Sequence, residues 1–303
     1  GVMDGQGDVW WGFGPIGYLE YGEDRPRLFE VENGVGVLVE RIRFVDSPYW
    51  TFWAHGVRGL EVRYCEVDVR RDDYDGHDYY DLTAFNTDGF DVSGRDVWIH
   101  HSKVWNQDDC FCVKGESQDM LFEDIEASGL GLTIGSIGNG HVVKNITFRN
   151  VYMPETYKGI YMKFRATGGV MKDILYENIV MDKPEQWPIW IGPAQQSDTR
   201  NLCAAHPCSI CWPSIPFTSC NAAEDGIFEN ITIRNVTINH PPGSAGVILG
   251  SKKHPMKNIV FDNVVVKYGT GTTYYKCEGV ETGIATNGTY PIPSCFKNNH
   301  STK

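Results

Sequence analysis

Residues 146–151 read ITFRNV, and residues 174–179 read ILYENI. Each stretch is apolar at alternate positions, then carries a polar pair that ends in Asn, and then turns apolar again. Apolar residues with period two and many Ile, Val, Phe and Tyr side chains are typical of a β-strand, whereas an amphipathic helix would space its apolar residues three and four apart. The pattern therefore predicts a strand that bends at the Asn and continues.

The same pattern recurs along the chain, with starts separated by 23–28 residues except for two intervals of 37 and 57 residues. A rung of about two dozen residues with loop insertions indicates a solenoid, whose rungs stack about 4.8 Å apart. We therefore predict an all-β chain, one right-handed parallel β-helix domain over residues 1–303 with roughly eight or more rungs. The copies start at Val37, Leu60, Val97, Met120, Ile146, Ile174, Ile231 and Ile259.

Several copies place Asn at the predicted bend, where stacked rungs would form a ladder of amide hydrogen bonds: Asn150, Asn178, Asn235 and Asn263. The two long intervals hold insertions, an acidic and aromatic one at residues 70–85 and a cysteine-rich one at residues 195–225. Loops on a solenoid usually surround the binding face. The first residues, GVMDGQG, read as the middle of a pattern, so we expect that an N-terminal rung is missing.

The formal net charge is −12, which argues against nucleic acid and anionic membranes as partners because both need a basic surface. No apolar stretch approaches the roughly 20 residues that span a bilayer. The chain has nine cysteines, so at least one thiol is free or bonded to another chain.

Four of the cysteines, Cys203, Cys208, Cys211 and Cys220, lie in a Pro-rich, uncharged stretch and favour a disulfide-clamped loop. The alternative is a zinc site, because Cys208 and Cys211 have ligand spacing. We also expect a disulfide-linked tail at residues 267–303. Together with the cysteines, five Asn-x-Ser/Thr sequons predict a secreted, extracellular glycoprotein with N-linked glycans: Asn145, Asn230, Asn235, Asn287 and Asn299.

Three aspartates are the candidate catalytic residues. Asp88 precedes Asp108 by 20 residues, close to one rung, so a solenoid would stack it beside Asp108 and Asp109. Carboxylates that converge in this way raise at least one pKa by repulsion, so one can remain a proton donor while the others act as bases. Glycoside hydrolysis needs such a pair, and inversion usually needs a carboxyl separation of about 6.5–9.5 Å.

Several stretches, among them GVMDGQGDVWW, NTDGFDV, QDDCFCVKG and GLTIGS, resemble the polygalacturonase family, glycoside hydrolase family 28, in order and spacing over most of residues 1–180. The resemblance implies a right-handed β-helix, an inverting mechanism and a pectin-type polysaccharide substrate. It also implies that Asp108 is the general acid and that Asp88 and Asp109 hold the attacking water. The candidate substrate contacts are Asn86, Gly131, Tyr161 and Lys163, and Trp105 is the best further sugar-contact candidate because it is close to Asp108.

Two positions depart from the family pattern. Gly129-Leu130-Gly131 replaces the usual Gly-His-Gly, and Tyr161-Met162-Lys163 replaces the usual Arg-Ile-Lys. The lost Arg would pair with a sugar carboxylate, so we expect weaker binding of anionic sugars and a stacking role for the Tyr161 ring. The predicted function is an inverting glycosidase of altered specificity.

The alternative is a catalytically silent β-helix, a structural or assembly glycoprotein that associates with itself through the solenoid ends. Three mutually repelling carboxylates favour the enzyme. No metal and no other cofactor is predicted, since the aspartate motifs do not suggest a calcium-dependent mechanism.

Overall fold

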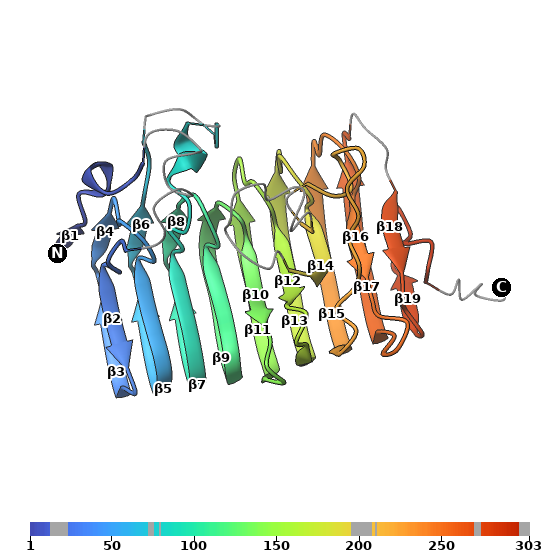
Figure 1. The fold of residues 1–303 in the computed structure, drawn as a ribbon, viewed down its shortest axis with the longest axis horizontal. Helices are drawn as coiled ribbons and strands as arrows, with labels where there is room; N and C mark the ends of the chain where they lie inside the picture. Colours follow the sequence, from blue (N-terminus) through green and yellow to red (C-terminus); the bar gives the residue numbers. More distant parts are fainter. Residues whose placement is uncertain are drawn as a thin grey trace.

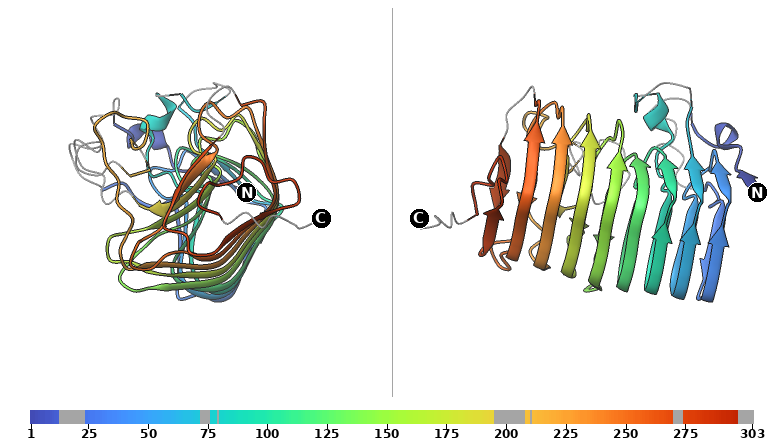
Figure 2. Two further views of the ribbon diagram at one scale, coloured as in Figure 1. Left: turned by 90° about the vertical axis from the view of Figure 1, so that its right-hand side faces the viewer. Right: turned by 180° about the vertical axis from the view of Figure 1, so that it is seen from behind.

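The computed structural model describes residues 1–12, 24–71, 76–78, 80–194, 208–209, 211–269 and 274–296. Within these residues nineteen strands form one continuous sheet, and neighbouring strands pair in parallel. The strands lie side by side along the long axis of the molecule (Figure 1), and the rungs superimpose around one core when viewed along it (Figure 2). The predicted all-β class and parallel β-helix are confirmed.

The strands make up three faces of the solenoid. The first face comprises β2 (Phe29–Glu32), the first parts of β5 (Phe52–Arg63), β7 (Phe90–His100) and β9 (Phe111–Ser128), then β10 (Leu132–Ile137), β12 (Ile160–Phe164), β14 (Ile189–Pro193), β16 (Gly246–Leu249) and β18 (Tyr275–Glu278).

The second face comprises β3 (Val35–Glu40), the later parts of β5, β7 and β9, then β11 (Val142–Met153), β13 (Gly169–Asp182), β15 (Gly226–Asn239), β17 (Lys257–Lys267) and β19 (Gly283–Thr286). The third face begins with β1 (Val2–Asp4), β4 (Arg43–Val45), β6 (Glu66–Asp68) and β8 (Lys103–Trp105) and continues into the end of β9. Two short 3-10 helices, η1 (Gly7–Val9) and η2 (Asp81–Thr83), complete the described elements.

The eight predicted repeat starts are in register on the second face. Each one pairs with the next: Val37 with Leu60, Leu60 with Val97, Val97 with Met120, Met120 with Ile146, Ile146 with Ile174, Ile174 with Ile231, and Ile231 with Ile259. Ile259 then pairs with Gly283, which starts a further strand that the repeat did not predict.

The predicted asparagine ladder runs along the bend that follows this register. Asn178 donates to Asn150, Asn235 donates to Asn178, and Asn263 donates to Asn235, each at 3.1 Å. All four residues have φ between 51° and 56°, a left-handed conformation that Asn tolerates better than most residues. The ladder therefore satisfies the side-chain amides while the backbone turns.

Aromatic side chains stack inside the solenoid. Phe52, Phe90 and Phe111 are fully buried in successive rungs of the first face, with ring centroids 5.2 and 5.3 Å apart. Burying such a ring removes a large apolar area from water and adds a favourable ring–ring contact. The stack brings β7 and β9 into close register directly after the predicted catalytic aspartates.

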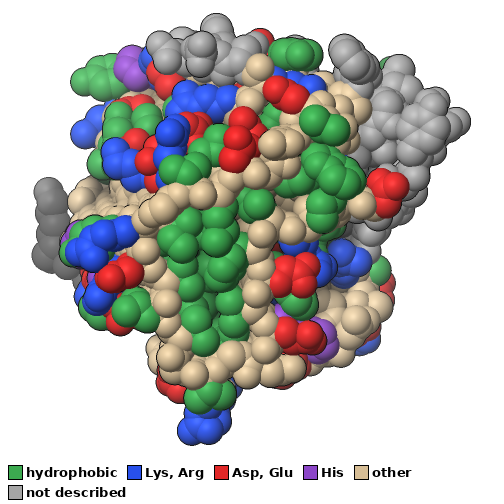
Figure 3. Space-filling view, turned by 90° about the vertical axis from the view of Figure 1, so that its left-hand side faces the viewer, with side chains coloured by type: hydrophobic (Ala, Val, Ile, Leu, Met, Phe, Trp, Pro, Cys, Tyr) green, Lys and Arg blue, Asp and Glu red, His purple; other side chains and the backbone are tan. Residues whose placement is uncertain are grey.

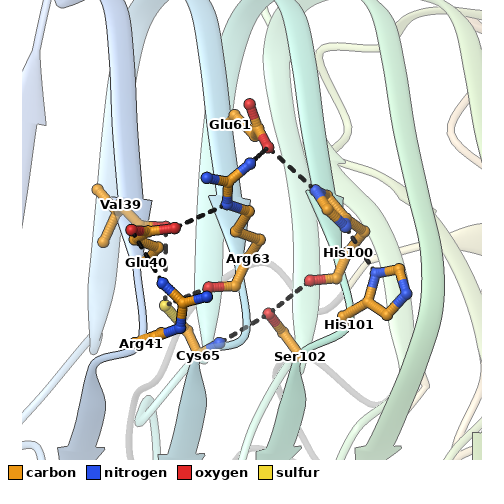
Figure 4. A network of polar contacts seen from close by, with 9 residues as sticks. All are labelled: Val39, Glu40, Arg41, Glu61, Arg63, Cys65, His100, His101 and Ser102. Atoms are coloured by element: carbon orange, nitrogen blue, oxygen red, sulfur yellow. Dashed lines mark hydrogen bonds and ion pairs between the residues drawn. The ribbon is translucent and has the colours of Figure 1, made fainter.

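A chain of ion pairs crosses the first strands of the second face, away from the aspartates (Figure 4). Arg63 lies 2.8 Å from both Glu40 and Glu61, and Glu61 lies 3.2 Å from His100. His100 is buried, whereas Arg63, Glu40 and Glu61 are partly exposed to water, so each of their ion pairs contributes only weakly to the stability of the fold.

The cysteines divide into disulfides and buried thiols. Cys208 is bonded to Cys220, Cys277 is bonded to Cys295, and Cys211 is also disulfide-bonded. The disulfide-clamped loop and tail are therefore present, and the zinc alternative for Cys208 and Cys211 is wrong. Cys203 lies outside the described residues. The free thiols of the described chain are all buried: Cys65, Cys110 and Cys112.

Four predicted glycosylation sites are exposed and have a left-handed backbone conformation: Asn145 lies within β11, Asn230 and Asn235 lie within β15, and Asn287 directly follows β19. Their side chains donate to the neighbouring rung, for example from Asn145 to Asp119 at 2.6 Å. Asn299 lies outside the described residues. None of the helices described here has the length and apolar character needed to cross a membrane.

Candidate active site

The three predicted aspartates meet at the N-terminal edge of two neighbouring strands. Asp88 lies two residues before the start of β7. Asp109 lies two residues before the start of β9, and Asp108 directly precedes it. Gly89 permits the close approach, since a Cβ there would lie 2.3 Å from the carbonyl oxygen of Cys110. The carboxylates offer oxygens that all lie within 4.8 Å of one another. All three residues are buried, and the solenoid brings their carboxyl groups together as their spacing predicted.

Asp109 is held as a carboxylate. Its oxygens accept from the Thr133 hydroxyl at 2.7 Å and from the Lys163 ammonium at 2.9 and 3.3 Å. Burial by itself would raise the pKa of Asp109, but the charges of Lys163 and Lys114 and the Thr133 hydrogen bond outweigh it and lower the pKa below its usual value. Asp109 is therefore an ionised base at neutral pH.

Asp108 has the opposite character. Burial and the charge of Asp109 raise the pKa of Asp108 to about 6. Its two oxygens accept from the backbone N–H groups of Asn86 at 3.1 Å and Asp109 at 2.9 Å, which orient the carboxyl group. Two adjacent carboxyl groups with pKa values displaced in opposite directions are what an acid–base pair requires.

Asp88 belongs to a second charged group that the sequence analysis did not identify. Lys114 lies 2.8 Å from Asp91 and 3.5 Å from Asp88. Burial, then the charges of Asp91 and Asp108, raise the pKa of Asp88 well above its usual value, and its Oδ1 atom has no hydrogen-bond partner among the described residues. Asp91 and Lys114 stand in the same quoted motifs, at positions that look like ordinary strand residues.

Lys158 is a further site residue that the sequence analysis missed. It precedes β12, is 2% exposed, and donates to Gln186 at 2.5 Å. Burial, then the charge of Lys163, lower the pKa of Lys158 to about 7. A single lysine in the stretch ETYKGI reads as a surface residue, and no sequence signal marks its burial.

Tyr161 does not offer the open ring face that we expected. The residue is 3% exposed, its hydroxyl lies 2.5 Å from the Ser209 hydroxyl, and the Lys163 ammonium lies 4.1 Å from its ring centroid. Tyr161 packs with Trp190, which is fully buried in the next rung. Its ring is therefore occupied by the protein, and the stacking role is wrong.

The other predicted substrate contacts interact with neighbouring residues of the protein. Asn86 holds Asp108 through its backbone N–H. Gly131 is buried with φ +101°, and a Cβ there would lie 2.0 Å from the carbonyl oxygen of Gly159, so close rung packing requires glycine. Trp105 is half-buried, and its ring already contacts the Arg70 guanidinium at 4.2 Å and the His77 ring at 5.0 Å.

His77 anchors the described part of the acidic insertion beside the site. Its ring nitrogens lie 2.9 Å from the Gln107 side chain and 2.9 Å from the Ser128 hydroxyl. Burial lowers the pKa of His77 to about 4, so the ring is neutral at neutral pH. Because Gln107 directly precedes Asp108, the insertion is fixed next to the candidate acid.

The three aspartates offer the oxygen ligands that hard cations prefer. Lys114 and Lys163 already lie against two of the three carboxylates, so their negative charge is balanced by side chains of the chain itself. The arrangement is suited to moving a proton and orienting water.

The comparisons with known proteins identify the family of the chain. A family model, "Glycosyl hydrolases family 28", matches residues 1–286. The chain is 32% identical over 196 residues to "Probable endopolygalacturonase C" of Aspergillus aculeatus, covering 63% of this chain and 48% of that protein. It is 41% identical over 166 residues to "Probable rhamnogalacturonase C" of Aspergillus flavus, covering 54% of this chain and 34% of that protein. The chain thus spans about half or less of the length of these relatives.

Among solved structures, endopolygalacturonase I from Stereum purpureum matches with a TM-score of 0.63 and 18% identity, covering 95% of this chain and 78% of that chain. At that identity the match supports the β-helix fold alone. The family assignment rests on the match along the sequence, which extends over nearly the whole chain. The chain belongs to glycosyl hydrolase family 28.

Proposed function

We propose that the chain is a glycoside hydrolase that cleaves a pectin-type polysaccharide with inversion. Asp108 protonates the leaving oxygen, Asp109 and Asp88 hold the attacking water, and Asp109, the group with the lowered pKa, accepts its proton. The observation that carries the proposal is the pair of adjacent buried carboxyl groups, one with a raised and one with a lowered pKa. A protonated acid beside an ionised base is what glycosidic cleavage requires.

The stereochemistry needs its own measurement. The nearest oxygens of the three carboxylates lie within 4.8 Å, closer than the about 6.5–9.5 Å separation typical of inverting glycosidases. Inversion is proposed from the family resemblance and from the two carboxylates, Asp88 and Asp109, available to one water. Anomeric analysis of the first product decides between inversion and retention.

The substrate is proposed to differ from that of a standard polygalacturonase. Leu130 and Tyr161 replace the family's usual His and Arg, and the relatives include a probable rhamnogalacturonase as well as a probable endopolygalacturonase. We therefore favour a galacturonate-containing mixed polysaccharide such as rhamnogalacturonan. The disulfides and sequons support an extracellular, glycosylated protein.

Replacing Asp108 with Asn tests the catalytic role. The amide cannot donate the acid proton, so hydrolysis of pectic polysaccharides should fall by about 10²–10⁴-fold. Product release from a panel of pectic, hemicellulosic and algal polysaccharides is the measurement, with circular dichroism to verify folding.

Asp96→Asn is the matched control, because Asp96 is exposed at a strand bend with φ 57° and Asn suits that conformation. Full activity in Asp108→Asn would reject the assignment. If the folded wild-type chain releases no product from any of the polysaccharides, the catalytically silent alternative is favoured.

Self-association through the solenoid ends is a separate proposal. Hydrophobic side chains gather in the middle of the N-terminal end face (Figure 3). Val2 and Val35, from the first strands of their faces, are 67% and 75% exposed. Apolar surface beside strand edges is a surface on which either a further rung or a second copy can pack.

A further inference from the structure

A groove of about 610 Å³ lies along the bend between the second and third faces. Successive rungs each contribute one bend residue to its lining: Tyr64, His101, Asp124, Asn150 and Asn178. The residue before each of them pairs with the residue before the next, so the five side chains form a row along the solenoid. Because rungs lie about 4.8 Å apart, this bend groove is about 19 Å long.

The third face separates the bend groove from the aspartates. Lys103, Glu126 and Tyr152 form a second row of lining residues, one from each of three neighbouring rungs of that face. Lys103 begins β8, whereas Asp108 follows the last residue of β8 by three positions. His101, which is drawn beside the ion pairs in Figure 4, lines the groove. A ligand can therefore occupy the groove without contacting the candidate catalytic residues.

Two tyrosine rings stand open in the bend groove. Tyr64 is 49% exposed and Tyr152 is 45% exposed, and three rungs, about 14 Å, separate them along the solenoid. Neighbours hold both rings in place: the Tyr152 hydroxyl donates to Asp182 at 3.0 Å, and the Tyr64 ring centroid lies 5.2 Å from that of His101. A fixed ring loses little freedom on binding, and tyrosine offers an apolar face with a polar tip. Such rings suit the apolar faces of sugars.

The groove also has hydrogen-bonding capacity to spare. Asn150 donates one amide hydrogen to Asp124 at 3.0 Å, and Asn178 donates one to Asn150 at 3.1 Å. An amide carries two hydrogens, so one donor per rung is left along this part of the ladder. Among the described residues, the Tyr64 hydroxyl has no hydrogen-bond partner either. Evenly spaced donors beside fixed rings match a linear chain of hydroxylated units.

The charges of the groove favour a neutral ligand. Two carboxylates, Asp124 and Glu126, and one ammonium, Lys103, line it. Lys103 already lies 3.2 Å from Glu126, and the Asp124 carboxylate lies 3.9 Å from the His101 ring. With histidine counted as neutral, the formal charge of the lining is therefore negative, which disfavours a sugar that carries a carboxylate of its own.

We propose that the bend groove binds a short run of neutral sugar residues, with the rings of Tyr64 and Tyr152 against sugar faces and the free amide hydrogens of Asn150 and Asn178 donated to hydroxyl groups. The proposal goes beyond the proposed function, because this site takes no part in cleavage. It gives the chain a second hold on a polysaccharide that bears neutral sugars, at a distance from the aspartates.

Titration calorimetry with the full chain tests the proposal. The neutral probes are oligosaccharides of galactan, arabinan and xylan, and oligogalacturonate is the acidic probe. At least one neutral probe should bind to the wild-type chain with little dependence on salt, and should bind equally to Asp108→Asn. Tyr64→Asn and Tyr152→Thr should each weaken this binding by about 2–10-fold. Both variants should fold, because Asn suits the left-handed φ of 53° at residue 64 and Thr suits a strand.

Tyr268→Asn is the matched control. Tyr268 is 70% exposed and has φ 56°, but it lies outside the groove, so this variant should bind as the wild type does. The proposal is overturned if no neutral probe binds, if Asp108→Asn abolishes the binding, or if Tyr64→Asn and Tyr152→Thr bind as tightly as the wild type. A sedimentation change in these two variants with unchanged sugar binding would instead assign the groove to contact between copies.

Hydrolysis is assayed separately on the polysaccharide panel, so the two proposals can fail independently. Binding of a neutral probe in the groove without any cleavage would reject the proposed function and leave the second site standing. Cleavage without such binding would reject the second site alone. A stronger, tyrosine-dependent binding of oligogalacturonate than of every neutral probe would overturn the assignment of a neutral ligand.

Discussion

At the scale of residues, the candidate site depends on the different surroundings of two adjacent carboxyl groups, those of Asp108 and Asp109. Asp109 faces Lys163 and Thr133, whereas Asp108 faces backbone N–H groups and its charged neighbour. Placing one residue on the cationic side of the strand end and the other against the preceding loop separates their pKa values. The pair then differs in protonation over the pH range in which the reaction is proposed to run.

Activity should therefore fall as the pH rises through about 6, because Asp108 loses its proton there. Toward lower pH activity should persist below the usual carboxyl range, since the pKa of Asp109 is lowered and the base stays ionised. The measurement is kcat against pH on the polysaccharide that proves to be cleaved. A flat profile between pH 5 and 8 would contradict the role of Asp108.

Leu130→His should move the falling limb of this profile to lower pH. Residue 130 lies one rung from Asp109, and its backbone N–H donates to the carbonyl oxygen of Asp108. A positively charged imidazolium at this position would favour the ionised form of Asp108 and so lower the pKa of the acid. Leu130→Gln is the uncharged control and should leave the limb in place. An unchanged profile in Leu130→His would mean that the neighbouring geometry has diverged along with the missing histidine.

The sequence was sufficient to predict that the three aspartates converge, because the spacing from Asp88 to Asp108 is close to one rung. It did not predict Lys158, Asp91, Lys114 or Thr133 as site residues. Their importance comes from burial by segments distant in sequence, such as Gln186 beside Lys158. Tyr161 was misjudged for the same reason, because Ser209 and its surroundings cover it.

At the scale of elements, the strands of the second face all bend through a residue in the left-handed conformation, and the sequence repeat predicted only the bends that carry Asn. Four Asn side chains form the predicted ladder, which continues through Asp124. Toward the N-terminus, other residues take the same left-handed conformation at the bend: Arg41, Tyr64 and His101, with φ of 54°, 53° and 49°. A bulky residue in this conformation has no sequence signature, so only the register of the strands reveals these positions.

Asn178→Ala should lower the free energy of unfolding by about 1–3 kcal/mol. The substitution removes two side-chain hydrogen bonds, one donated to Asn150 and one accepted from Asn235. It also forces Ala into a left-handed conformation with φ 55°. Asn178→Gly also removes the amide but accepts that conformation, so it separates the two causes. Denaturant unfolding is the measurement, and identical losses in both variants would assign the whole effect to the amide ladder.

At the scale of the whole molecule, the solenoid stacks each rung on its neighbours, and loops from distant rungs complete the site. Cys208 and Cys220 pack against the cluster that contains Tyr161. Their disulfide therefore fixes Ser209 over the tyrosine, whereas the Cys277–Cys295 disulfide lies in the C-terminal part of the chain.

Replacing Cys208 and Cys220 by Ser should raise KM several-fold, because the segment that covers Tyr161 loses its clamp. It should also cost about 2–4 kcal/mol of stability from the less restricted unfolded chain. The matched variant, Cys277→Ser with Cys295→Ser, should lose stability while KM stays constant. Steady-state kinetics and thermal unfolding are compared, and an equal rise of KM in both pairs would refute a local effect.

The buried thiols impose an order on oxidative folding. Burial raises the pKa of Cys65, Cys110 and Cys112, and the thiol form cannot attack a disulfide. In the unfolded chain these same cysteines compete with the cysteines that form disulfides. The native disulfides are therefore protected from exchange with these thiols only after the central rungs have folded and buried them. In this chain, folding of the hydrophobic solenoid thus limits incorrect disulfide pairing.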